Sequence, residues 1–201
     1  MCKNSVLGFV ILYGILTAIT PLYAVPIDLV IFNNSVLATD TSLKFTVEAL
    51  DGGAGKVDFL IKNLSTMNST IANIYFDGDY LSSISKITCS QGTKFSIGAT
   101  PSNLPGSQKL PFIFKSDFSV GATPPPSKNG IDPGESITVR FNLLSGHSSA
   151  EIISQLNNGD LRIGAHIISV GPNKVSVSAV TPEPVTIGLL GLGGLLILKQ
   201  K

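Results

Sequence analysis

Residues 43–49 read Leu43-Lys-Phe-Thr-Val-Glu-Ala49, and apolar and polar side chains alternate along this stretch without exception. The same alternation appears at 56–62, with Leu60 as its one exception, and again at 137–143. A period of two places one face of a strand against a core and the other in water, which is typical of antiparallel sheets. These three stretches therefore predict an antiparallel β protein.

Seven further stretches carry weaker strand signals: 27–32, 71–76, 84–89, 94–97, 110–114, 161–170 and 174–180. Asp-Gly, Asn-Gly and Pro-Gly pairs separate many of them, because these residues adopt the backbone angles that tight turns require. The irregular stretch 101–106 and the Pro-rich stretch 121–134 are expected to form surface loops. About ten short strands at this spacing predict an all-β fold, an antiparallel β-sandwich of jelly-roll or immunoglobulin-like topology.

One short helix is expected at 148–156. Ser148 stands before an apolar stripe and Glu151 follows three residues later, which is the sequence of a capping box. Gly159 is placed to cap the other end.

Charge and cysteine content describe the body at 25–181. Three of the 14 basic residues and one of the 13 acidic residues lie outside it, which leaves a nearly neutral body. A nucleic-acid-binding domain would need a clustered positive face, so no nucleic-acid partner is expected. Cys2 lies in the front segment and leaves Cys89 alone in the body, so no internal disulfide is expected. We interpret Cys89 as a small buried side chain rather than a reactive thiol.

The front end, 1–24, has the pattern of a secretory signal peptide. Lys3 is its only charge, a run of apolar residues follows, and Ala24 stands at the expected cleavage site. The apolar run is shorter than the roughly 20 residues that span a bilayer. An uncleaved N-terminal anchor is the alternative.

The most tempting catalytic pattern surrounds Ser148, in Gly146-His-Ser-Ser-Ala150, with Asp160 and His166 following in the chain order of a hydrolase. That nucleophile elbow belongs to parallel sheets with several helices, and Ser148 already has a role as a helix cap. His147 and His166 are too far apart in sequence for a strong metal site, and a strand histidine bonded to a neighbour is the simpler reading of His166. We therefore expect no enzyme, no metal and no cofactor.

A carbohydrate surface is the best positive hypothesis for the body. Tyr75 and Tyr80 flank Asp77-Gly-Asp79, and aromatic rings can stack on sugars, so Tyr75, Asp77, Asp79 and Tyr80 are candidate ligand residues. The Pro-rich loop is a second candidate place. The two aspartates lack the further ligands of a calcium loop, so no calcium site is expected there. If the segment binds no sugar, we expect it to be an ordinary turn.

The tail, 182–201, resembles the PEP-CTERM sorting signal of exported bacterial proteins. Pro182-Glu183-Pro184 precedes an apolar, Gly-rich run at 185–198, and the chain ends with Lys199 and Lys201. The resemblance implies a Gram-negative host that makes exopolysaccharide or biofilm, and recognition by an exosortase, a membrane-embedded protease that cuts near the triplet. Two lysines stand where the family usually has an Arg-rich cluster.

The apolar run predicts a transmembrane helix at 185–198. Fourteen residues reach about 21 Å at 1.5 Å per residue, short of the ~30 Å hydrocarbon core, so a transient stop fits better than a durable anchor. The basic end should stay cytoplasmic and the body should face the periplasm. An ordinary single-span tail anchor is the alternative.

Parts of the body also resemble cargo domains that carry this signal, namely 76–77, 81–85, 131–135, 161–166 and 168–171. The expected function is a non-enzymatic protein, exported through the inner membrane, anchored transiently, and then sorted to the cell surface or extracellular matrix. Exopolysaccharide is its expected partner there. A secreted carbohydrate-binding module is the alternative, and a secreted serine hydrolase is a remote one.

Overall fold

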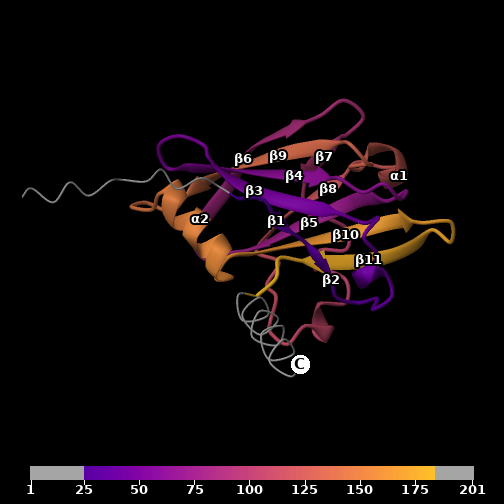
Figure 1. Ribbon diagram of the computed structural model, residues 1–201. Helices are drawn as coiled ribbons and strands as arrows, with labels where there is room; N and C mark the ends of the chain where they lie inside the picture. The colour runs from indigo at the N-terminus through magenta and orange to yellow at the C-terminus, as the bar shows by residue number, and fades with distance from the viewer. Residues whose placement is uncertain (1–24, 184–201) are drawn as a thin grey trace, which may run out of the picture.

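The computed structural model describes residues 25–183, and they form two antiparallel sheets packed face to face (Figure 1). The predictions for 1–24, including Ala24, and for 184–201, including Pro184, Lys199 and Lys201, lie outside the described residues. The first sheet has the order β1 (Ile27–Asp28), β3 (Phe45–Asp51), β4 (Lys56–Asn63), β9 (Ser136–Leu143), β6 (Leu81–Cys89). The second has the order β2 (Val30–Ile31), β11 (Val175–Val180), β10 (Arg162–Val170), β5 (Thr70–Asp77), β8 (Phe118–Ala122), β7 (Phe95–Ile97). The predicted all-β class is confirmed.

Helices are few and lie at the margins. They are α1 (Pro126–Asn129), α2 (Ser149–Asn158) and the single-turn elements η1 (Leu37–Thr39) and η2 (Ser107–Lys109). In the described part of the chain, none of them has the length and apolar content needed to cross a bilayer.

The core lies between the two sheets and contains the alternating side chains that the sequence indicated. Phe45, Val47 and Ala49 of β3 are buried, and every second residue of β9 is buried as well. Phe59 and Phe141 pack against Phe76 of the opposite sheet, with ring centroids 5.4 Å and 4.8 Å apart. The period-two pattern therefore fixes which face of each strand turns inward.

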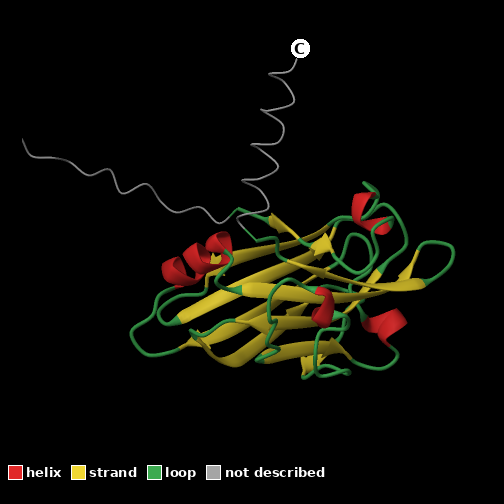
Figure 2. Cartoon of the chain, turned by 90° about the horizontal axis from the view of Figure 1, so that it is seen from below, coloured by secondary structure: helices red, strands yellow, loops and turns green. Residues whose placement is uncertain are grey.

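The second sheet is covered on its outer face as well, by the long segment 98–117. All eight residues of β5 are buried. Tyr75 of β5 donates a hydrogen bond to the carbonyl of Pro101 at 2.9 Å, and Asn73 donates to the carbonyl of Thr100 at 3.1 Å. Seen from below, the segment crosses in front of the strands (Figure 2).

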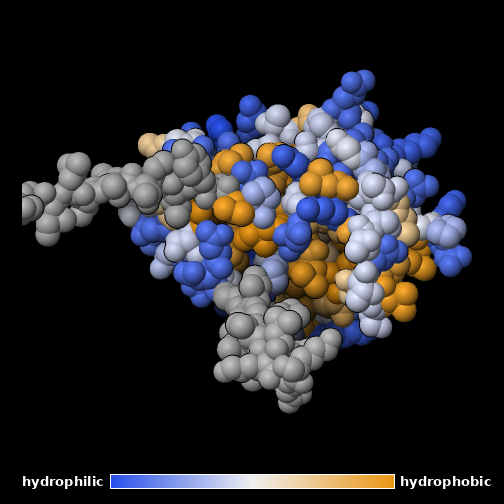
Figure 3. Space-filling view, viewed as in Figure 1, coloured by the Kyte–Doolittle hydropathy of each residue, from blue (hydrophilic) through white to orange (hydrophobic). Residues whose placement is uncertain are grey.

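The view of Figure 1 looks at the side where the two-residue strands β1 and β2 leave the core partly uncovered. Apolar residues reach the surface over this side (Figure 3), where Val30 of β2 is 45% exposed. In Figure 3 these apolar residues gather into one area in the middle of the view.

Two strand predictions need correction, and one strand was missed. The stretch 110–114 is a loop, and Pro111 within it cannot donate to a ladder. The stretch 27–32 is two strands in different sheets, because the chain passes from β1 to β2 at Leu29. Strand β8 at 118–122 was not predicted.

The helix α2 begins and ends with the caps that the sequence predicts. Ser148 accepts a hydrogen bond from the Glu151 amide, the Glu151 carboxylate accepts one from the Ser148 amide, and Gly159 closes the helix with φ of 75°. The capping box is therefore confirmed.

The Pro-rich stretch 121–134 holds the short helix α1 as well as irregular chain. Cys89 is exposed rather than buried, because it ends the edge strand β6.

Candidate functional site

The chain leaves the sandwich at Thr181, beside β10. The Thr181 amide donates to the carbonyl of Ile163 at 3.0 Å, and the Ile163 amide donates to the Thr181 hydroxyl at 3.1 Å. Thr181 is only 1% exposed. The next residues, Pro182 and Glu183, therefore follow the folded body without an intervening linker.

Arg162, at the start of β10, contacts three other parts of the chain. Its guanidinium nitrogens lie 3.4 Å from the Glu183 carboxylate and 3.7 Å from the Asp77 carboxylate. The guanidinium carbon lies 4.3 Å from the centre of the Phe112 ring, within the range of a cation–π contact. The Glu of the triplet is thus held at the surface of the body.

Asp77 is the buried partner in this cluster. Burial raises the pKa of its carboxyl above the ordinary value, while the hydrogen bond from the Lys115 amide and the charge of Arg162 act in the opposite direction. The Lys115 amide donates to Asp77 at 3.1 Å. No spacing rule joins Asp77, Arg162 and Glu183, because they are distant along the chain.

The four candidate ligand residues around 75–80 do not form one surface. Tyr75 is fully buried, and burial raises the pKa of its phenol to about 12. A platform for sugar stacking needs an exposed ring, so the prediction is wrong for Tyr75. Asp77 is turned toward Arg162, Asp79 is exposed, and Tyr80 stacks on the His147 ring at 3.8 Å between centroids.

The residues of the hydrolase hypothesis have other partners. The Ser148 hydroxyl donates to the Glu151 carboxylate at 3.1 Å, within the helix cap. His166 shares a hydrogen bond of 2.6 Å with the hydroxyl of Ser176 across the β10–β11 hairpin. Asp160 follows α2 and is exposed. Among residues 25–183, no Ser–His–Asp relay connects these side chains, and His166 behaves as a strand histidine bonded to a neighbour.

Histidine and carboxylate side chains do not gather into a metal site within the described chain. Nδ1 of His147 lies 3.6 Å from the Glu151 carboxylate, and in the described chain no third His, Cys, Asp or Glu side chain joins this pair to form a metal site.

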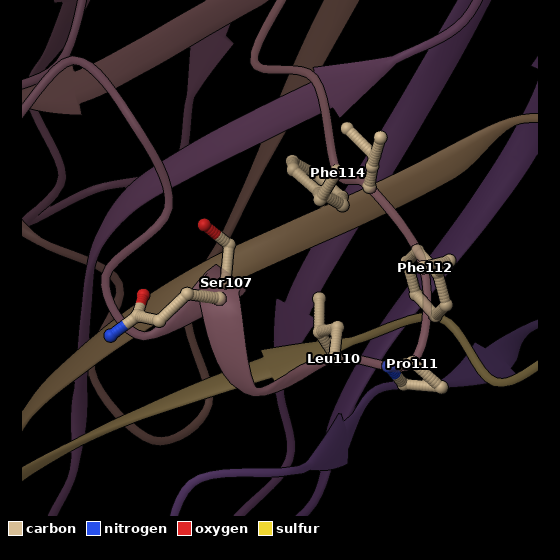
Figure 4. Close-up of a pocket in the computed structure, with 7 residues that line it drawn as sticks. Ser107, Leu110, Pro111, Phe112 and Phe114 are labelled. Carbon is tan, nitrogen blue, oxygen red and sulfur yellow. The ribbon is translucent and has the colours of Figure 1, made fainter.

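A hollow of about 410 Å³ opens within the loop 107–114 (Figure 4). It is lined by Leu110, Pro111, Phe112 and Phe114 together with polar residues of η2. All of its walls come from one loop, and Figure 4 shows this loop lying over strands of the second sheet. Its apolar side chains therefore belong to the cover of that sheet, as the contact of Phe112 with Arg162 also indicates.

Comparison of the chain with protein-family models gives no match, and comparisons with curated proteins and with solved structures give none either. The resemblance of the tail to a sorting signal therefore remains a hypothesis based on its residues.

Proposed function

We propose that this chain is a non-enzymatic cargo protein, exported and then sorted to the cell surface or extracellular matrix through its C-terminal tail. The observation that carries the proposal is the junction at Thr181. The folded body ends there, and the Pro-Glu-Pro triplet follows at once with Glu183 held by Arg162. The start of the triplet therefore lies at the point where the chain leaves the second sheet, which marks a boundary between the folded body and the tail.

The proposed route begins with removal of 1–24 after Ala24. The apolar run at 185–198 would then halt in the membrane, with Lys199 and Lys201 on the cytoplasmic side. An exosortase would recognise Pro182, Glu183 and Pro184 and release the body. We propose that the released protein lies in the exopolysaccharide outside the cell.

For the body, we propose a sandwich of the jelly-roll kind rather than the immunoglobulin kind. The supporting observation is that most consecutive strands lie in opposite sheets, as in the sequence β4, β5, β6, β7. In the immunoglobulin order, strands A and B share one sheet, as do D and E, and strands F and G share the other.

The proposal is tested by expressing the full chain in a Gram-negative host with and without its exosortase. A Pro182→Ala/Glu183→Ala double variant should accumulate in the membrane fraction as a longer chain, as should the unaltered chain in exosortase-deficient cells. Glu48→Ala, at a residue of β3 in the other sheet, is the matched control and should be processed normally. Normal processing of the double variant would contradict the proposal.

Carbohydrate binding remains a second candidate function, although the region of Tyr75 and Tyr80 no longer supports it. The Pro-rich loop now gives it better support, because Ser127 and Asp132 of that loop line a polar hollow.

A further inference from the structure

A polar hollow of about 260 Å³ opens where the β10–β11 hairpin turns. Its walls come from four segments: 68–70 at the start of β5, Ser127 of α1, 132–133, and the hairpin between Ser169 and Lys174. The hairpin tip and α1 lie at the same end of the sandwich, opposite to α2 (Figure 1). The hollow is therefore separate from the tail junction and from Ser148.

One wall holds a fixed carboxylate. The Thr70 hydroxyl donates to Asp132 Oδ1 at 2.5 Å, and Thr70 itself is 4% exposed. The Asp132 amide donates to the Glu135 carboxylate at 2.9 Å, which fixes the backbone as well. Oδ2 of Asp132 forms no hydrogen bond to another described residue, so it is available as an acceptor.

The rim around Asp132 carries groups of complementary kinds. The side chains of Asn68, Ser127, Ser169 and Lys174 form no hydrogen bond or ion pair with other described residues. Together they offer an amide, two hydroxyls and an ammonium group, which can donate and accept hydrogen bonds.

The backbone of the rim is strained at two of these residues. Ser169 has φ of 57° and Lys174 has φ of 48°, and they are the two non-glycine residues with positive φ in the described chain. Glycine would adopt these angles without a steric cost. Ser169 lies at the register shift of β10 and Lys174 lies in the turn of the hairpin, so the local backbone fixes where these two side chains stand on the rim.

The charges and the neighbouring surface narrow the class of ligand. Asp132 and Lys174 carry opposite charges, so the hollow has no net charge with which to select an anion or a cation. Across Gly171 lies a second hollow of about 280 Å³, whose walls include Met67, Val170 and Val175. Each hollow alone is smaller than the roughly 300–1,000 Å³ of a small-molecule pocket, whereas the two side by side reach that range.

We propose that this surface binds a neutral oligosaccharide. The sugar hydroxyls would bond to Asp132, Lys174 and the rim hydroxyls, and an apolar C–H face would lie on the hollow beside Val175. The inference rests on the second candidate function, carbohydrate binding, to which it assigns a site and a ligand class, and it does not depend on the proposed routing of the chain.

The test uses the full chain, purified in a detergent without a sugar headgroup, and isothermal titration with neutral cello-, laminari- and malto-hexaose and with anionic oligogalacturonate. At least one neutral hexaose should bind, and Asp132→Asn and Lys174→Ala should each weaken that binding by about tenfold, the effect of one hydrogen bond to a charged group. The matched controls Asp160→Asn and Lys86→Ala, at exposed residues outside the hollow, should bind normally.

Ser169→Gly separates binding from folding. It relieves the positive φ and removes the hydroxyl, so thermal stability should rise while affinity for the neutral sugar falls. The proposal is overturned if no neutral hexaose binds, if oligogalacturonate binds more tightly than the neutral sugars, or if the hollow variants bind as the unaltered chain does. Processing of the tail is a separate readout, so failure here leaves the routing proposal unaffected.

Discussion

Arg162 of β10 holds the carboxylate of Glu183 at 3.4 Å, twenty-one residues along the chain and just beyond the last strand. Asp77 lies on the other side of the same guanidinium, and Phe112 lies against it. The start of the tail is therefore attached to the folded body by a side chain that the body itself positions.

Replacing Arg162 tests this attachment. Arg162→Ala should free residues 182–183, so the amide of Thr181 should exchange its hydrogen faster. Because Arg162 and Glu183 are partly exposed, with side-chain exposures of 25% and 31%, their ion pair should contribute less than about 1 kcal/mol to global stability. Glu183→Gln measures this contribution alone, since Arg162→Ala also removes the partner of the buried Asp77. Hydrogen exchange with mass spectrometry measures the local effect and thermal unfolding measures the global one.

Arg162→Lys is the matched control, since it keeps the charge but loses the planar group over Phe112. It should give an intermediate exchange rate. Unchanged exchange at Thr181 in Arg162→Ala would mean that the hydrogen bonds to Ile163 alone hold the chain end.

A methyl group at Gly164 should displace the cover of the second sheet. A Cβ at this position would lie 2.7 Å from a Leu104 methyl carbon and 3.1 Å from the Phe114 ring. Overpacking of this kind costs roughly 1–3 kcal/mol, so Gly164→Ala should lower the free energy of unfolding by that amount. Urea unfolding measures the loss.

The double variant Gly164→Ala/Leu104→Ala is the control for that contact. Leu104 is 2% exposed, so Leu104→Ala is itself destabilising, but it removes the methyl carbons that the new Cβ would meet. The loss of unfolding free energy in the double variant should therefore be smaller than the sum of the losses in the two single variants. Strict additivity would show that the cover does not lie where the structure has it.

Loss of the helix cap should weaken α2. Ser148→Ala removes the hydroxyl that accepts the Glu151 amide, which typically costs about 1 kcal/mol. Thermal unfolding followed by circular dichroism should show a lower midpoint, while Ser154→Ala, at an exposed position inside the helix, should be close to neutral. A midpoint unchanged in Ser148→Ala would contradict the capping role.

Because of His166, the free energy of unfolding should decrease as the pH is lowered below about 6.5. Burial lowers the pKa of His166 below its ordinary value of 6.5, so the unfolded chain binds this proton more readily than the folded chain does. The contribution is complete above about pH 6.5 and is lost as the pH falls through 6.5 toward the folded pKa. Urea unfolding between pH 8 and pH 5.5 measures this slope.

His166→Gln is the comparison for the pH series. It keeps a hydrogen-bonding group near Ser176 but does not titrate, so its stability should change less over the same range. Asp77, whose pKa is raised, is present in both chains and so does not affect the difference between them. Equal slopes in the two chains would rule out His166 as the source.

The strands that the sequence predicted best are those with a single wet face. In β3, β4 and β9 apolar and polar residues alternate along the sequence, because one face of each strand packs against the core. The capping box of α2 is also local, since its partners lie three residues apart. Local patterns of this kind can be read without knowing the tertiary structure.

The cover over β5 could not be read in the same way. Tyr75 was interpreted as exposed because it is an aromatic residue next to a turn, but segment 98–117 covers it through Pro101. The nearly continuous apolar run Ile71-Ala-Asn-Ile-Tyr-Phe76 was the available signal, because strands buried on both faces lose their alternation. The partners of Arg162 depend on the same tertiary arrangement and carry no signal in the sequence.

The central claim is that the tail routes the body to the cell exterior, and the mass of the native protein tests it most directly. Intact-mass measurement on protein recovered from the surface or medium of its host should give a chain that starts at Val25 and ends near Pro182–Pro184. A full-length C-terminus that still carries Lys201, in protein recovered from the inner membrane, would contradict the account.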